Sequence, residues 1–146
     1  MTELLERAVS LLHSRQVSCV VLKDGEEPYL SSDIGIKPLM IRLREDKKAF
    51  EKAAVADKIV GKAAAMMAVY GGALAVYGEV MSEAAEAFLK GQHVECCFFT
   101  KVPYIENRTR TGRCPMEETV MDIEDMPTAF DALEAAIARL MEGRKN

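Results

Sequence analysis

The chain has 146 residues, of which 49% are hydrophobic and 29% charged, so it is large and apolar enough to form one globular domain over residues 1–146. Its formal charge of −4 argues against a nucleic-acid partner, and its longest apolar run, over residues 63–76, is interrupted by two glycines and is too short for a membrane span. The acidic, amphipathic N-terminus and four cysteines without a framework-like spacing are typical of a cytoplasmic protein with reduced thiols.

The first thirty residues predict a helix followed by a β-hairpin. Thr2 is a suitable cap for the helix, whose apolar side chains recur at helical spacing. These side chains are Leu4, Leu5, Ala8, Val9, Leu11 and Leu12. The β-branched run Val17–Lys23 then meets Asp24-Gly25, a preferred two-residue turn, which predicts antiparallel pairing with residues 26–30.

A second helix is expected after a turn over residues 31–35. Pro38 suits the first helical position, and the apolar pattern continues to about Glu45. Residues 46–52 are rich in lysine, so we expect them to be exposed, with Phe50 as their apolar anchor.

The stretch over residues 55–72 reads as a central buried helix. Asp57 is a good N-cap, and Gly71 or Gly72 provides the left-handed residue that ends many helices. One face is apolar at helical spacing, with Ile59, Val60, Ala63, Ala64, Met67 and Tyr70. Lys58 and Lys62 share the opposite side of the first turns, where helix stability alone does not favour positive charge. Two interpretations stay open: an anion bound at the helix N-terminus, or lysines that are solvated or paired with acids elsewhere.

The second half of the chain predicts a parallel strand pair and a closing helix. A strand over residues 73–80, a helix capped by Ser82 that stops at Gly91, and a strand over residues 94–100 form a right-handed crossover. Residues 127–141 form an amphipathic helix whose inward side chains are Phe130, Leu133, Ile137 and Leu140. Together with the hairpin, this order predicts a three-layer α/β/α sandwich with a mixed sheet.

The loop over residues 101–113 is long, polar and basic, which is typical of functional or mobile segments. Its lysine, three arginines, asparagine, tyrosine and two threonines are together suited to bind a phosphate or a carboxylate. Pro115 fits a first helical position, so Cys114 is the expected cap of a short helix, where the dipole lowers a thiol pKa. The alternative is a cysteine that only fills space, because no histidine base is near in sequence.

No metal or cofactor site is expected from the sequence. His93-Val-Glu95 matches the short H-x-E pattern of zinc deaminases but begins a strand, and Cys96 and Cys97 are adjacent and face opposite sides of it. Neither histidine has the neighbours that a nucleophilic triad needs. The acidic cluster of Asp122, Glu124 and Asp125 is more typical of a solvated helix end than of a divalent-ion site.

Two motif blocks resemble the domain-of-unknown-function 1893 family over nearly the whole chain. They are Ala56–Ala65, followed by Gly-Gly and a strand, and Val102–Arg108 with Gly112–Glu117. The resemblance implies a cytidine-deaminase-like α/β/α fold, in which the central helix takes the place of the histidine-bearing helix. Asp57, Lys58 and Lys62 stand there, and residues 81–85 replace the two cysteine ligands, so the implied fold lacks the zinc ligands.

Our first hypothesis is a binding domain for an anionic small molecule, such as a nucleotide, at the N-terminus of the central helix. Asp57 caps the helix, Gly112 lets the loop approach, and the cationic and amide side chains contact the anion. The expected ligand-binding residues are Asp57, Lys58, Gly61, Lys62, Asn107, Arg108 and Gly112.

Two alternatives belong to other functional classes. The first is an enzyme that uses Cys114 as nucleophile or Lys62 as an amine of lowered pKa, with Glu117 or Asp57 transferring protons. The second is a structural subunit whose apolar faces form an oligomer, the simplest being a homodimer.

Overall fold

The computed structural model describes residues 1–107 and 109–145. Within these residues the elements are, in chain order, α1 (Glu3–Ser14), β1 (Cys19–Leu22), β2 (Tyr29–Ser31), α2 (Lys37–Glu45), β3 (Ala54–Val60), α3 (Lys62–Tyr70), β4 (Ala75–Ser82), α4 (Glu83–Gly91), β5 (Glu95–Val102), α5 (Pro115–Val120) and α6 (Met126–Lys145).

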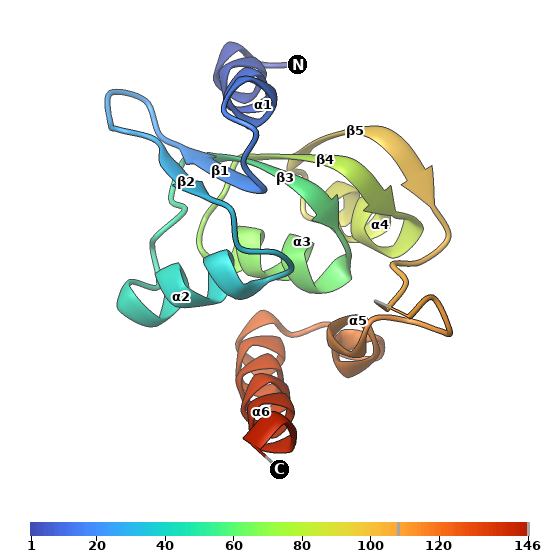
Figure 1. Ribbon diagram of the computed structural model, residues 1–146. Helices are drawn as coiled ribbons and strands as arrows, with labels where there is room; N and C mark the ends of the chain where they lie inside the picture. The colour runs from blue at the N-terminus through green and yellow to red at the C-terminus, as the bar shows by residue number, and fades with distance from the viewer. Residues whose placement is uncertain (108, 146) are drawn as a thin grey trace.

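The strands form one mixed sheet in the order β2-β1-β3-β4-β5. β1 runs antiparallel to both of its neighbours, whereas β4 is parallel to β3 and β5. α1 lies alone against one face, and the other helices lie on the opposite side, with α5 and α6 packed beyond α3 (Figure 1). The expected mixed sheet with helices on both faces, an α/β sandwich, is therefore confirmed.

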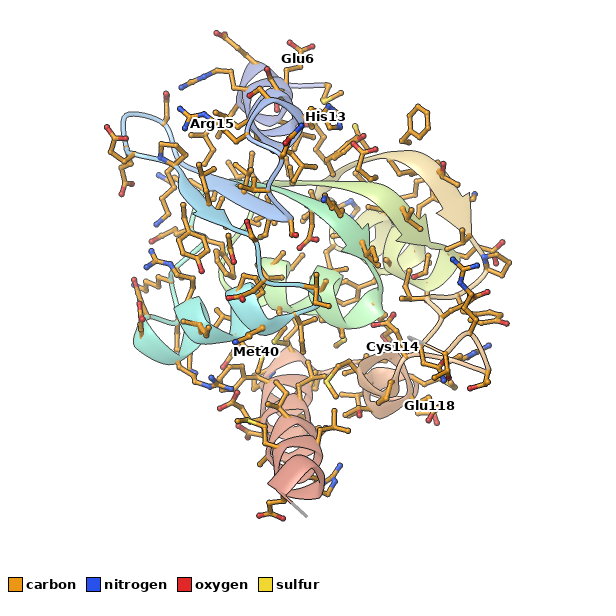
Figure 2. The ribbon with its side chains drawn as sticks, in the orientation of Figure 1. Glu6, His13, Arg15, Met40, Cys114 and Glu118 are labelled. Carbon is orange, nitrogen blue, oxygen red and sulfur yellow. The ribbon has the colours of Figure 1, made fainter. Side chains whose placement is uncertain are left out.

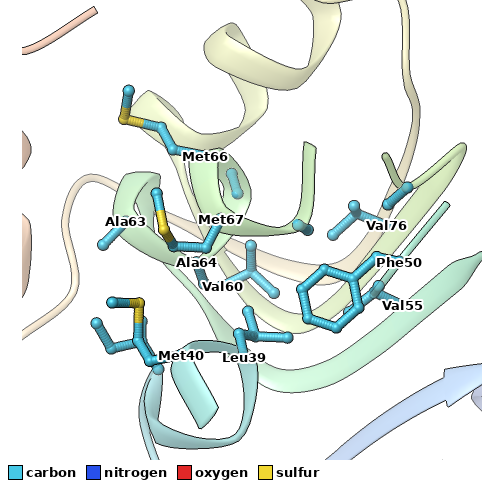
Figure 3. Packing of buried hydrophobic residues seen from close by; sticks show 14 of the residues in the cluster. Leu39, Met40, Phe50, Val55, Val60, Ala63, Ala64, Met66, Met67 and Val76 are labelled. Atoms are coloured by element: carbon cyan, nitrogen blue, oxygen red, sulfur yellow. The ribbon is translucent and has the colours of Figure 1, made fainter. Parts of the chain in front are cut away.

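The sheet separates two hydrophobic cores. The smaller one joins α1 to the sheet, through Leu5, Leu12 and Tyr77 among others. The larger one surrounds α3, whose residues 62–68 are all buried. Figure 3 shows Met66 and Met67 of this helix in the same cluster as Phe50. Because α3 is enclosed on every side, its first turn is fixed in position, and the candidate site begins there.

The predicted caps of two helices and one predicted buried anchor are confirmed. Thr2 accepts a hydrogen bond from the Leu5 amide at 3.4 Å and caps α1. Ser82 accepts one from the Ala85 amide at 3.1 Å and caps α4, which ends at Gly91 as expected. Phe50 is fully buried within an otherwise mostly exposed lysine-rich segment.

The expected start of the central helix is wrong. Asp57 lies in β3, paired with Cys19 of β1 and with Gly78 of β4, and α3 begins only at Lys62. Asp57 is therefore no helix cap, and Lys58 shares no helix face with Lys62. The physical reason is that β3 is an interior strand with ladder partners on both sides, and these pairings override a local helical spacing of apolar residues.

Two smaller expectations are also wrong. The hairpin closes by a longer connection than the two-residue Asp24-Gly25 turn, since the last pair between its strands is Val21 with Tyr29. Leu140 is 45% exposed, because the C-terminal part of α6 extends beyond the core that its first turns cover.

Candidate functional site

The N-terminus of α3 is occupied by a carboxylate of the chain itself. The Lys62 amide donates to Glu117 Oε1 at 2.5 Å, and the Ala63 amide donates to Oε2 at 3.0 Å. Glu117 belongs to α5, so a residue far along the chain satisfies two first-turn N–H groups that a helix leaves without intrahelical partners.

Gly61 makes this close approach possible. A Cβ atom at position 61 would lie 2.1 Å from Glu117 Oε1. Only a residue without a side chain lets the carboxylate reach the helix end at this position, which holds α5 tightly against α3.

The side chain of Lys62 leads away from this carboxylate into a cavity. Lys62 is 8% exposed, and its Nζ donates to the Met121 carbonyl and to Glu124 Oε1, both at 3.1 Å. A buried ammonium needs such partners, because burial of an unpaired charge is costly. The lysine is held by one exposed carboxylate and one backbone oxygen.

The cavity has a volume of about 440 Å³, within the range of small-molecule sites. It lies where β4 and β5 end, between α4, the loop after β5 and α5, and this edge is where α/β proteins with parallel strands commonly bind ligands. Its wall consists of Lys62, Ser82, Glu83, Ala84, Ala87, Phe88, Pro103, Tyr104, Arg113, Glu117, Met121 and Glu124.

A second cation lies on the cavity wall. The Arg113 guanidinium lies over the Tyr104 ring, with its central carbon 5.3 Å from the ring centre, and Nη1 is 3.5 Å from the Met121 sulfur. Among the described residues no carboxylate lies within 4 Å of its nitrogens. The planar donor fork of Arg113 is thus stacked and oriented without an ionic partner.

Glu117 combines burial with charge partners. Burial raises the pKa of its carboxyl group, while the two backbone N–H donors and the Lys62 charge oppose that rise. A half-buried carboxyl group on a cavity wall beside a lysine is the kind of group that sites use for binding or proton transfer.

The predicted residues Asp57 and Lys58 lie away from this cavity. Asp57 is 4% exposed; its Oδ1 accepts from the Ile59 amide at 3.2 Å, and its Oδ2 has no hydrogen-bond partner among the described residues. Burial raises the pKa of Asp57 to about 7. Lys58 is exposed on β3. The cavity wall therefore includes neither of them.

Asn107 and Gly112, which were predicted to bind a ligand, make hydrogen bonds within their own loop. The Asn107 side chain makes hydrogen bonds with Thr109 and Thr111, and the backbone amide of Asn107 donates to the Gly112 carbonyl at 2.9 Å. Neither Asn107 nor Gly112 is on the cavity wall, and Arg108 lies outside the described residues.

Cys114 is at the expected N-cap of α5, close to Glu118 in Figure 2, but its thiol makes no capping hydrogen bond. Its amide donates to the Ile105 carbonyl at 2.9 Å. It is not among the residues that line the cavity. The structure thus brings together Lys62 and Glu117, but not Cys114, from the predicted catalytic residues.

The sequence assigned neither Ser82 nor Glu83 to a binding site, whereas Arg113 and Tyr104 belong to the basic loop over residues 101–113 that was expected to bind an anion. The positions of all four in the sequence could have identified them as site residues, because all of them lie at the ends of predicted parallel strands or in the basic loop that follows. Over residues 1–107 and 109–145, no three His, Cys, Asp or Glu side chains converge as metal ligands. No helix of the described chain is both long and apolar enough for a membrane span.

Comparison with known proteins confirms the family resemblance. The family model described as TM1506, Domain of unknown function (DUF1893), matches residues 7–137. A crystal structure of a DUF1893 family protein (TM1506) from Thermotoga maritima is similar to this structure with a TM-score of 0.81 and 23% identity, over 92% of this chain and 90% of that chain. That likeness shows a shared fold. No curated protein matches the chain. With nearly its whole length matched, the chain belongs to the TM1506 family of domains of unknown function, DUF1893.

Proposed function

We propose that this chain is a single-domain, cytoplasmic protein that binds an anionic small molecule, such as a nucleotide, in the cavity beside α3. The observation that carries the proposal is the Lys62 ammonium, which reaches the cavity from a side chain that is otherwise buried. A cation held in a partly water-excluded site attracts an anion more strongly than a surface lysine does.

The present partner of Lys62 is exchangeable. The Glu124 side chain is 80% exposed, whereas that of Lys62 is 10% exposed. An ion pair with one partner in solvent contributes little to stability, so a ligand anion competes with Glu124 at small cost. Glu124 then moves into water, where a carboxylate is fully solvated.

Arg113 provides the second contact. Its guanidinium lies on the same cavity wall and has a fork of donors that fits a phosphate or a carboxylate. The guanidinium lies over the ring of Tyr104. This contact already restricts the side-chain conformations of Arg113, so less conformational entropy is lost when a ligand binds.

The proposed position of the anion differs from our initial hypothesis. Glu117 already occupies the end of α3, so the anion binds at the ammonium of Lys62 rather than at the helix amides. The cytidine-deaminase-like character of the fold remains part of this proposal. An enzyme that uses Cys114 as nucleophile is not supported by the geometry, because that thiol is not on the cavity wall.

A homodimer is the second candidate role, and one observation favours it. β5 is an edge strand of the sheet, and Phe99 on it is 78% exposed. Edge strands with large exposed apolar side chains commonly pair with another chain. Size-exclusion chromatography with light scattering tests this role, and a monomer at all accessible concentrations would exclude it.

The test of binding uses inorganic phosphate, AMP and ribose 5-phosphate in thermal-shift and calorimetric titrations. A ligand at about a hundred times its Kd adds roughly 2.7 kcal/mol to the free energy of unfolding. Arg113→Gln should weaken binding by about tenfold, since it removes one charge-assisted contact. Arg110→Gln is the matched control, because Arg110 lies in the same loop and not on the cavity wall. Absence of binding to wild type, or equal affinities of the two variants, contradicts the proposal.

A second variant changes affinity in the opposite direction. Glu124→Gln removes the carboxylate that competes for Lys62, so phosphate affinity should rise several-fold, on the scale of an exposed ion pair of about 0.5–1 kcal/mol. Unchanged or lower affinity would show that the anion does not take the place of Glu124.

A further inference from the structure

The charges of the cavity wall limit which anions fit it. Besides the cations Lys62 and Arg113, the cavity wall contains three carboxylates, those of Glu83, Glu117 and Glu124. A bare polyanion would meet repulsion from these groups. A suitable ligand therefore needs a second kind of group besides its anionic one.

Glu117 is the carboxylate that a ligand cannot displace. Both oxygens are held by backbone amides of α3, at 2.5 Å and 3.0 Å, and Gly61 leaves only enough space for this arrangement. In contrast, Glu124 is free to leave because its side chain is mostly in solvent. Any ligand in the cavity must thus be compatible with a fixed carboxylate at one end.

The chemistry of that carboxylate requires a hydrogen-bond donor. An ionised carboxylate only accepts hydrogen bonds, and each oxygen can accept about two. One position on each oxygen is used by an amide of α3, which leaves further acceptor positions on a residue that lines the cavity. A ligand hydroxyl or N–H group satisfies them, whereas an apolar or anionic group leaves them unpaired at a cost.

The two subsites are separated by the length of one lysine side chain. Glu117 accepts from the backbone amide of Lys62, while the ammonium of the same residue lies at the far end of its four-methylene side chain and donates to Glu124. A phosphate at the ammonium and a hydroxyl at the carboxylate span this separation in a phosphorylated five-carbon sugar. A cavity of about 440 Å³ has room for such a molecule.

We infer that Glu117 is the specificity-determining residue of this cavity and that the ligand is a hydroxyl-bearing phosphate, a sugar phosphate or the ribose phosphate of a nucleotide. This inference rests on the proposed function and specifies its substrate class. In dinucleotide-binding folds a carboxylate likewise accepts a hydrogen bond from a ribose hydroxyl group. Glu117 acts here as a binding residue, and no reaction is implied.

The experiment compares two phosphates of equal charge by calorimetry. The probes are ribose 5-phosphate and cyclopentylmethyl phosphate, which has a ring of similar size and no hydroxyl groups. Wild type should bind ribose 5-phosphate tighter by about tenfold or more, the effect of hydrogen bonds to a charged group. Glu117→Gln should abolish this preference and keep affinity for cyclopentylmethyl phosphate.

Glu118→Gln is the matched control, because it removes the same charge one residue away in α5 from an exposed position outside the cavity. Circular dichroism of both variants verifies folding, and the wild-type comparison of the two probes stands even if Glu117→Gln does not fold. Equal affinities of wild type for the two probes overturn this inference and leave the proposed function intact. A ribose 5-phosphate preference that persists in folded Glu117→Gln also overturns it. No binding of either probe or of inorganic phosphate refutes the proposed function and this inference together.

Discussion

Asp57 gives the sharpest test of the electrostatics of this fold. Asp57 is only 4% exposed, one oxygen of its carboxyl group has no hydrogen-bond partner in the part of the chain that the structure describes, and burial raises the pKa of the group to about 7. The unfolded chain has an Asp pKa of about 3.9. Between these values the native state holds a proton that the unfolded state has released, so the free energy of unfolding falls as the pH rises through this window.

The magnitude follows from the separation of the two pKa values. About three units at about 1.4 kcal/mol each give roughly 4 kcal/mol in total, present below pH 4 and lost by about pH 7. Roughly 3 kcal/mol of this change falls between pH 5 and pH 8. A domain with a total stability of about 5–15 kcal/mol should show it clearly.

Asp57→Asn removes the titration and keeps the shape of the side chain. Urea unfolding of both proteins at half-unit steps from pH 5 to pH 8 should give a falling profile for wild type and a profile flatter by roughly 3 kcal/mol for the variant. At pH 8 the variant should be the more stable protein, since it avoids an ionised carboxylate with an unpaired oxygen. Parallel profiles for the two proteins would refute the assignment of the raised pKa to Asp57.

Two further predictions concern packing. Gly61→Ala should cost about 1–3 kcal/mol in urea unfolding, because the new methyl group displaces the Glu117 carboxylate from α3. Gly91→Ala should change stability by less than about 1 kcal/mol, because within the described residues its added carbon would have no neighbour within 4 Å apart from the adjacent residues and the backbone of its own helix. Phe50→Ala should cost about 3–5 kcal/mol because the ring is fully buried, and Phe99→Ala, at a site 78% exposed, should cost less than about 0.5 kcal/mol. Equal costs within either pair would contradict the packing described for α3 and its surroundings.

The parts of the fold that sequence predicted well depend on local chemistry. Thr2 and Ser82 cap their helices through side-chain oxygens that reach only three residues along the chain. The boundary between β3 and α3 depends instead on partners far away, because Asp57 pairs with Cys19 and Gly78. A buried interior strand lacks the polar–apolar alternation that identifies a surface strand, so its apolar residues also matched a helix.

In the candidate site, too, the features that depend on local sequence were predicted and those that depend on distant residues were not. Lys62 was identified because a lysine at a helix start is locally unfavourable, and the structure places it on a cavity wall. Glu117 was expected to transfer protons and was not expected at the end of α3, since no local pattern connects two residues 55 positions apart. Arg113 and Tyr104 become neighbours only when the loop after β5 folds back toward α5.

The hydrogen bonds between Glu117 and the first turn of α3 can form only late in protein synthesis. During synthesis the chain emerges from its N-terminus, so the α3 segment and the strands around it are complete while its two first-turn amides still lack their carboxylate. The helix end stays open until α5 has been made and has docked. About the last fifth of the chain, from residue 115 on, therefore completes the end of α3, and a ribosome stalled before residue 117 would hold a nascent chain whose central helix is uncapped.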